Sequence, residues 1–161
     1  MEAAVASLIA WFSLPEHGLS SIFVVAFVSA TLLPLGSEPA VFGFVKLNPQ
    51  LFWAAIAVAT AGNTAGGVVD YWLGYGAHEA LARGKETRYW KWFRALGPKA
   101  MFFAWLPGLG DPLCTVAGWL RMPFWPSVAW MAFGKLLRYL LITAALLWVP
   151  NAWWASIARL F

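Results

Sequence analysis

The amino-acid sequence predicts an all-α integral membrane protein with a single membrane domain over residues 1–161. Of these residues, 61% are hydrophobic and only 11% are charged, and the mean hydropathy is +0.68. Soluble domains carry roughly a quarter charged residues, so this composition cannot form a water-facing surface. Apolar stretches reach the ~20 residues that a transmembrane helix needs. Many of the tryptophans stand near the ends of these stretches, as an interfacial aromatic belt requires: Trp53, Trp72, Trp90, Trp92, Trp105, Trp125, Trp153 and Trp154.

Charge and cysteine content exclude several classes of protein. The net charge is +4, but most basic residues fall within residues 77–99, between apolar runs. This clustering indicates orientation in a membrane rather than nucleic-acid binding. The single cysteine, Cys114, has no Cys or His neighbour at metal-ligand spacing. We therefore expect no disulfide, no metal site and no cofactor, and we interpret Cys114 as a packing residue.

Residues 1–18 are predicted to form an interfacial N-terminal helix. The apolar run 3–14 stops at Pro15 and is too short to span a bilayer comfortably. Residues 1–18 lack a basic n-region and carry Glu2 at the front. We therefore expect the chain to keep this segment rather than lose it as a signal peptide.

Residues 19–75 are predicted to form a first repeat that begins with a re-entrant helical hairpin. The apolar stretch 19–47 is interrupted in its middle by Pro34, Gly36 and Pro39. Prolines remove backbone donors, and open backbone at membrane depth is tolerated only where protein or a wet cavity covers it. A hairpin that enters and leaves on one face satisfies this condition.

A transmembrane helix over residues 51–75 completes the first repeat. Gly62 and Gly66 form a small-x-x-x-small face suited to close helix packing. Residues 77–99 follow as the one polar region, with basic and aromatic residues interleaved, and we expect an amphipathic surface helix there.

Residues 100–149 are predicted to form a second repeat of the same kind. Its first part is broken between Pro107 and Pro112, and residues 124–149 again reach spanning length. The remaining residues, 150–161, are expected to lie at the interface.

The two repeats share sequence patterns, and their order predicts inverted topology. A hairpin that returns to its entry face, followed by one crossing, makes the second repeat start on the opposite face. The positive-inside rule then places residues 77–99 in the cytoplasm. The matching patterns are Leu33-Pro34-x-x-x-Glu38-Pro39 with Leu106-Pro107-x-x-x-Asp111-Pro112, and Gly62-Asn63-x-x-Gly66 with Gly134-Lys135-x-x-Arg138.

Two cations fall inside the last predicted transmembrane helix. Lys135 lies eleven positions into that helix, or about 16 Å deep at 1.5 Å per residue, and Arg138 shares its face. Central placement of each costs about 2.5 kcal/mol or more, so an anion should face them. Two candidates stay open, an internal ion pair with Asp70, Glu38 or Asp111 and a bound anionic substrate.

The acidic residues of this region and Asn63 can each be given a structural role or a functional role. Glu38 and Asp111 each precede a proline, so we expect them at the N-cap positions of two half-helices. Burial of these caps in the membrane would also suit proton coupling or gating, together with Asp70. Asn63 shares a helix face with Asp70 and corresponds to Lys135 in the second repeat, which makes it either a substrate ligand or interhelical glue.

The motifs over residues 29–139 resemble the DedA superfamily, also called SNARE-associated or VTT-domain proteins, and in particular its small YqaA-type branch. They are Ser29 to Pro39, Gly62-Asn63-Thr64-Ala65-Gly66-Gly67 with Tyr71-Trp72-Leu73-Gly74, Trp105 to Pro112, and Ala117 to Pro123. The resemblance implies two re-entrant hairpins with helices in inverted repeat, and a role in transport or scrambling of lipids such as undecaprenyl phosphate and phospholipids.

The same resemblance implies roles for single residues. Glu38 matches the family's acidic residue in the first hairpin. Typical members carry an arginine after Pro-Gly in the second hairpin, whereas Leu109, Gly110 and Asp111 follow here. We infer that Lys135 and Arg138 supply the displaced positive charge.

The sequence therefore favours a membrane transporter or flippase for an anionic, phosphate-bearing lipid, with proton coupling as a further expectation. Lys135, Arg138 and Asn63 would bind the substrate. The alternative is a noncatalytic membrane organiser whose buried charges pair structurally. No nucleophile or metal cluster supports an enzyme. We expect membrane lipids as partners and no nucleic acid, and the sequence allows a homo-oligomer.

Overall fold

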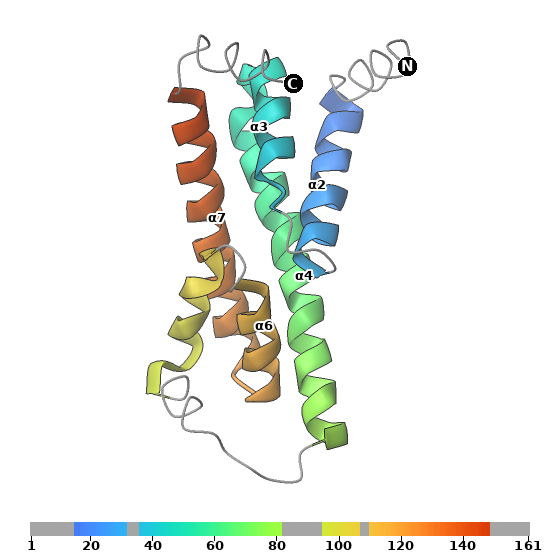
Figure 1. Ribbon diagram of the computed structural model, residues 1–161, viewed down its shortest axis with the longest axis vertical. Coiled ribbons are helices and arrows are strands. Elements are labelled where there is room, and N and C mark those ends of the chain that lie inside the picture. The colour runs from blue at the N-terminus through green and yellow to red at the C-terminus, as the bar shows by residue number, and fades with distance from the viewer. Residues whose placement is uncertain (1–14, 32–35, 82–94, 107–109, 149–161) are drawn as a thin grey trace, which may run out of the picture.

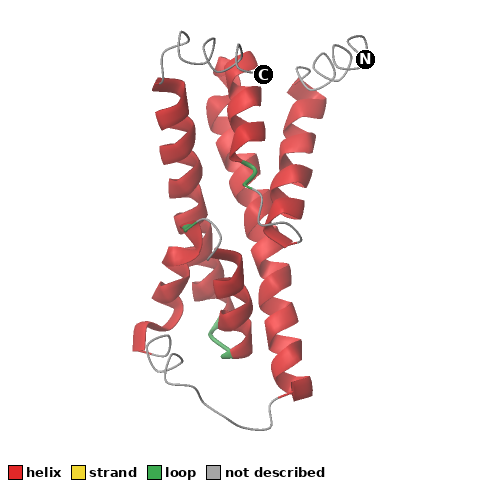
Figure 2. Cartoon of the chain, in the orientation of Figure 1, coloured by secondary structure: helices red, strands yellow, loops and turns green. Residues whose placement is uncertain are grey.

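The structure, a computed structural model, describes residues 15–31, 36–81, 95–106 and 110–148. Within these ranges the chain is helical and the loops between helices are short (Figure 2). The elements are α2 (Pro15–Thr31), α3 (Glu38–Leu47), η1 (Pro49–Leu51), α4 (Phe52–Leu81), η2 (Gly97–Trp105), α6 (Gly110–Trp119) and α7 (Phe124–Trp148).

The helices form an elongated bundle around α4 and α7 (Figure 1). The helix α2 leads from the upper end of the view to the middle, and α3 leads back upward. The helix α4 then descends along almost the whole molecule, η2 rises to the middle, and α6 descends again before α7 ascends. The helix α2 packs on α4, and η2 packs on α7. The second short helices cross over: α3 contacts α7, and α6 packs on α4.

Several boundaries differ from the sequence prediction. The helix α4 extends to Leu81, six residues beyond the predicted end, so the start of the expected surface segment 77–99 continues α4 instead. The first arm of the second broken segment is a 3-10 helix that already begins at Gly97. Pro34, Pro107, residues 82–94 of the surface segment, residues 1–14 and the C-terminal segment 150–161 lie outside the described residues. Residues 15–18, predicted to belong to the interfacial N-terminal helix, instead form the first turn of α2.

Proline helps to define where the described helices start. Pro39 lies in the first turn of α3 and Pro126 in the first turn of α7, where the missing N–H would have no intrahelical partner. Pro112 likewise falls in the first turn of α6. A short helix therefore starts at mid-bundle after each break: α3 after the break that follows α2, and α6 after the break that follows η2.

Two apolar clusters form the core, one at each end of the bundle. The upper cluster joins α2, α3, α4 and α7 and includes Phe44, Ile56 and Tyr139. The lower cluster joins α4, η2, α6 and α7 and includes Met101 and Met131. Because the clusters separate along both long helices, a layer remains between them at mid-bundle.

Glycines allow the close helix contacts on α4. A Cβ on Gly62 would lie 2.5 Å from the carbonyl oxygen of Phe23, and one on Gly66 would lie 2.6 Å from the Cβ of Ala30. Real side chains do not tolerate such separations, so α2 and α4 can approach this closely only with glycine at these positions. On α7, a Cβ on Gly134 would likewise overlap the carbonyl oxygen of Phe102 in η2.

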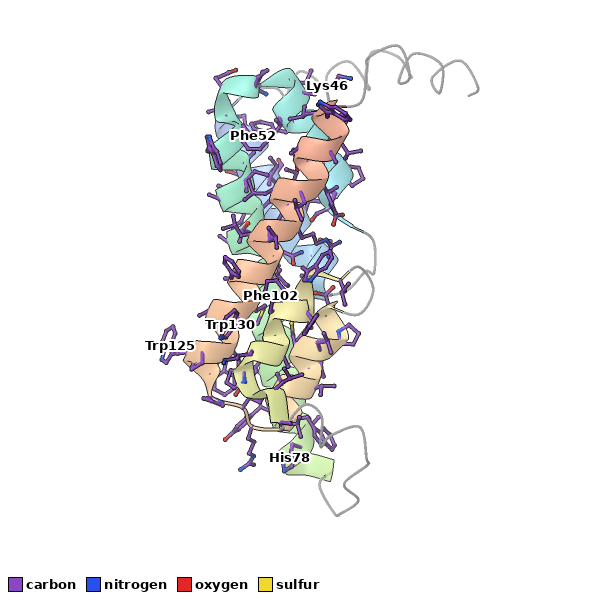
Figure 3. The ribbon with its side chains drawn as sticks, turned by 90° about the vertical axis from the view of Figure 1, so that its left-hand side faces the viewer. Lys46, Phe52, His78, Phe102, Trp125 and Trp130 are labelled. Atoms are coloured by element: carbon purple, nitrogen blue, oxygen red, sulfur yellow. The ribbon has the colours of Figure 1, made fainter. Side chains whose placement is uncertain are left out.

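The outer surface is apolar and rich in tryptophan. Trp125 is 77% exposed and Trp148 is 90% exposed, and Trp53 is also largely exposed. Figure 3 shows Trp125 pointing away from the bundle. Within the described residues, Pro49–His78 and Phe124–Trp148 are long and apolar enough to cross a membrane. A surface of this kind is suited to contact with lipid.

Candidate functional site

The layer between the two apolar clusters is polar and charged. On α7, Lys135 and Arg138 lie between the Met131 of the lower cluster and the Tyr139 of the upper cluster. On α4, Asn63 similarly lies between Ala59 and Tyr71. The breaks before α3 and α6 bring Glu38 and Asp111 to this layer, where both contact α7.

Arg138 pairs with Glu38. Its guanidinium Nη2 forms an ion pair with Oε1 of the Glu38 carboxylate, and the two side chains are only 13% and 11% exposed. The Nε of Arg138 is buried and has no hydrogen-bond partner within the part of the chain that the structure describes. Arg138 therefore neutralises Glu38 while one of its donors stays unused.

A second contact joins the same two elements. The hydroxyl groups of Ser37 and Tyr139 lie 2.5 Å apart and form a hydrogen bond, with both residues buried. Ser37 precedes Glu38, and Tyr139 follows Arg138. The start of α3 is thus attached to α7 by an ion pair and a neighbouring hydrogen bond.

Lys135 is bound from two sides and is 1% exposed. Its Nζ donates to the backbone carbonyl of Asn63 at 2.6 Å and to Oδ1 of Asp111 at 3.4 Å. A Cβ on Gly67 would lie 3.0 Å from this Nζ, so the glycine leaves room for the ammonium beside α4. Asp70 also interacts electrostatically with both Lys135 and Asp111.

The predicted capping role of the acids is wrong for Glu38. The N-cap of α3 is Ser37, and Glu38 is the first helical residue. Asp111 likewise lies inside the first turn of α6, which begins at Gly110. Both carboxylates pair with cations on α7 instead, Glu38 with Arg138 and Asp111 with Lys135.

The side chain of Asn63 does not reach toward the cations. Its Nδ2 donates to the carbonyl oxygen of Ala26 at 3.0 Å and joins α4 to α2. This contact corresponds to the interhelical alternative considered for Asn63. Only its backbone carbonyl belongs to the charged layer, because it accepts the bond from Lys135.

Sequence reasoning missed Ser37 and Tyr139 as members of the site. A signal for Tyr139 was available, because a tyrosine in an apolar helix needs a partner for its hydroxyl when buried. Ser37 stands in the broken segment next to Glu38, and its partner lies 102 residues further along the chain, so no local pattern marks the contact. No group of three or more His, Cys, Asp or Glu in the described ranges could hold a metal ion.

The layer thus holds two cations, each paired with one acid, and a third acid, Asp70, that interacts electrostatically with Lys135 and Asp111. Buried cations need anionic partners, and these acids provide them. The long apolar helices, the lipid-facing surface and the interior ion pairs together define a helical integral membrane protein with a charged centre.

Comparison with known proteins assigns the family. The VTT domain matches residues 39–146. "Inner membrane protein YqaA" of Escherichia coli strain K12 is 32% identical over 141 residues, which cover 84% of this chain and 95% of the relative. An uncharacterised protein of Haemophilus influenzae is 35% identical over 134 residues, covering 76% of this chain and 83% of that protein. The chain belongs to the VTT-domain family of the DedA superfamily, which confirms the resemblance seen in the sequence. No solved structure matches it.

Proposed function

We propose that the protein transports or flips an anionic, phosphate-bearing lipid across the bacterial inner membrane. The observation that carries this proposal is the bonding of Arg138. Its guanidinium lies in the charged layer, pairs with one carboxylate and keeps a buried Nε without a partner among the described residues. A guanidinium offers five donors, and a phosphate accepts two in parallel. A lipid phosphate is therefore a suitable exchange partner for the carboxylate of Glu38.

The arrangement of the helices supports the inverted-repeat part of the proposal. In each half, the first arm packs on the long helix that follows it, as α2 does on α4 and η2 does on α7. In each half, the second arm reaches the long helix of the other half, as α3 does on α7 and α6 does on α4. Two halves related in this way are typical of transporters whose substrate site lies at the midplane.

We assign different roles to the two cations. Arg138 binds the lipid phosphate, and its pair with Glu38 closes the site when no lipid is bound. Lys135 is fully buried and donates to the backbone carbonyl of Asn63. Through its ion pair with Asp111 it holds the start of α6 against α7. Proton coupling would act through the acids, because Glu38, Asp111 and Asp70 share this layer with the cations.

Orientation and partners complete the proposal. The basic segment 77–99 faces the cytoplasm, by the positive-inside rule, and the relative from Escherichia coli is named an inner membrane protein. Membrane lipids are the partners, nucleic acid is not one, and the protein is not an enzyme. Self-association into a homo-oligomer is compatible with this account.

A second candidate function is a noncatalytic membrane organiser. It is favoured by the observation that both cations already pair within the chain, Arg138 with Glu38 and Lys135 with Asp111. Buried charges that are fully neutralised can serve the fold alone.

Transport in vesicles separates the two candidates. Purified protein in vesicles that carry a fluorescent anionic phospholipid should move that lipid between leaflets. A double variant Glu38→Gln with Arg138→Gln keeps two side chains that can bond to each other but removes the cation. We expect it to stay folded and to lose transport, whereas Lys46→Gln, at an exposed position, should retain it. Equal transport by the double variant and the wild type would refute the role of Arg138.

A further inference from the structure

Gly36 lies beside the charged layer, two residues before Glu38, and its missing side chain makes room for the carboxylate of that residue. A Cβ on Gly36 would overlap Oε2 of Glu38 and would lie 2.9 Å from the carboxyl carbon and 3.4 Å from Oε1. Outside the adjoining residues, these three carboxyl atoms are the nearest ones to that position. The Glu38 side chain therefore folds back over its own chain and occupies the space that a side chain at position 36 would need.

The contact at Gly36 differs from those at other closely packed glycines of the bundle. At Gly62 and Gly134 the missing Cβ leaves room for the backbone of a neighbouring element, which cannot move without a shift of that element. At Gly36 it leaves room for the end of a flexible side chain. A methyl group at position 36 would therefore displace a carboxylate rather than separate two helices.

The backbone beside Gly36 is held in place, so the carboxylate is the part that has to move. Ser37, the next residue, is 3% exposed, and its hydroxyl is hydrogen-bonded to that of Tyr139 on α7. The carbonyl of Ser37 accepts a bond from the N–H of Val41 in α3 at 3.2 Å. These two bonds fix the chain between Gly36 and Glu38.

Movement of the carboxylate would change the bonding of Arg138. Oε1 of Glu38 forms the ion pair with Arg138 and belongs to the carboxylate that the added Cβ would displace. The Nε of Arg138 already has no hydrogen-bond partner in the part of the chain that the structure describes. A buried guanidinium that loses its carboxylate is left with an uncompensated charge, which favours the binding of another anion.

We propose that Gly36 is a positioning residue of the charged layer, because only a residue without a side chain lets the Glu38 carboxylate close on Arg138. Any side chain at position 36 would hold the carboxylate away and leave Arg138 open to a lipid phosphate. Gly36 thus sets how strongly the protein's own acid competes with the substrate. The effect on the ion pair follows from the contacts above, whereas the effect on lipid binding rests on the proposed function.

The alternative is that Gly36 serves only the shape of the broken segment. The two roles differ in their dependence on Glu38. If the carboxylate mediates the effect, Gly36→Ala changes nothing further once Glu38→Ala has removed the carboxylate. If the shape of the chain requires glycine, Gly36→Ala has the same effect with and without Glu38→Ala.

The experiment measures two quantities in purified full-length protein in detergent. The first is the energetic coupling between Glu38 and Arg138, from a double-mutant cycle of Glu38→Gln and Arg138→Gln performed with and without Gly36→Ala. The second is the Kd for a fluorescent phosphatidylglycerol. Gly36→Ala should remove most of the coupling and lower the Kd by about tenfold, as neutralisation of Glu38 should. Gly43→Ala in α3 is the matched control and should change neither quantity, since nothing lies within 4 Å of its Cβ position.

Several results would overturn the inference. One is full coupling between Glu38 and Arg138 in the presence of Gly36→Ala. Another is an unchanged Kd in Gly36→Ala when Arg138→Gln abolishes binding. A third is a change in Kd that persists when Glu38→Ala is also present, because the carboxylate then has no part in it.

Two further outcomes are distinguished by the same set of variants. If Gly36→Ala alone does not fold, its combination with Glu38→Ala should fold, and failure of both would overturn the inference. If wild type does not bind phosphatidylglycerol, the proposed function fails, and the coupling measured with and without Gly36→Ala still decides the role of Gly36.

Discussion

Arg138 of α7 and Glu38, the first residue of α3, form an ion pair between the two apolar clusters of the bundle. The pair is joined by the neighbouring hydrogen bond between Ser37 and Tyr139. Together these contacts hold the start of a short helix against a long one at mid-bundle. The counterpart of this pair joins Lys135 of α7 to Asp111 in the first turn of α6.

The Glu38–Arg138 pair should show strong energetic coupling. Glu38→Gln or Arg138→Gln alone leaves a buried charge without its partner, and we expect each to lower the free energy of unfolding by about 3–5 kcal/mol. The double variant should lose clearly less than the sum of the single losses. Denaturation in detergent measures all three. Additive losses would show that the two residues do not interact in the folded protein.

Asp111→Asn should cost less stability than Glu38→Gln. The side chain of Asp111 is 31% exposed, against 11% for Glu38, and it lies 3.4 Å from Nζ of Lys135, so its charge is less completely enclosed by the protein. Lys135 also keeps its bond to the carbonyl of Asn63 when Asp111 is neutral. We expect a loss of about 1–2 kcal/mol, measured by thermal unfolding beside Glu38→Gln. A loss as large as that of Glu38→Gln would mean that Lys135 depends mainly on Asp111.

Glycine positions at the helix contacts should be sensitive to one added methyl group. Gly62→Ala and Gly134→Ala introduce a Cβ against the backbone of α2 and η2 respectively, and we expect each to cost about 1–3 kcal/mol. Gly43→Ala and Gly76→Ala are matched controls within helices, because nothing lies within 4 Å of their Cβ positions. The controls should be neutral or gain up to about 1 kcal/mol of helix propensity. Equal melting temperatures for all four variants would contradict the close packing.

The sequence predicted the long helices and the breaks well, because these depend on local chemistry. Apolar runs of spanning length and prolines at mid-run decide where helices α4 and α7 lie and where α3 and α6 start. The end of α4 at Leu81 was predicted less well. Its last turns contain polar residues that resemble a surface segment, and only the three-dimensional structure shows that the helix continues.

The sequence identified the charged residues of the layer but did not predict which acid pairs with which cation. Depth and spacing identified Lys135 and Arg138 as cations that need anions, and the candidates included Glu38 and Asp111. Which acid meets which cation depends on how the broken segments pack on α7, and a single sequence does not specify that packing. The hydrogen bond between Ser37 and Tyr139 was missed for the same reason.

The two ends of the bundle should lie on opposite faces of the membrane. In Figure 3 Lys46 lies at one end and His78 at the other, and η2, which carries Lys99, starts toward the His78 end in Figure 1. Cysteines placed singly at Lys46 and Lys99 in a Cys114→Ala background should therefore react with an impermeant reagent from opposite faces. Labelling of both positions from the same face of oriented vesicles would rule out the inverted repeats.

The most direct test of the central proposal is the affinity of purified Glu38→Gln protein for a phosphate-bearing lipid. If the lipid phosphate and the Glu38 carboxylate compete for Arg138, removal of the carboxylate charge should tighten binding. We expect a Kd lower by about tenfold, or 1.4 kcal/mol, in Glu38→Gln, and loss of binding in Arg138→Gln. Arg138→Lys should weaken binding more than Lys135→Arg does, since lysine lacks the bidentate fork. Unchanged affinity in both Glu38→Gln and folded Arg138→Gln protein would contradict the account and favour the membrane organiser.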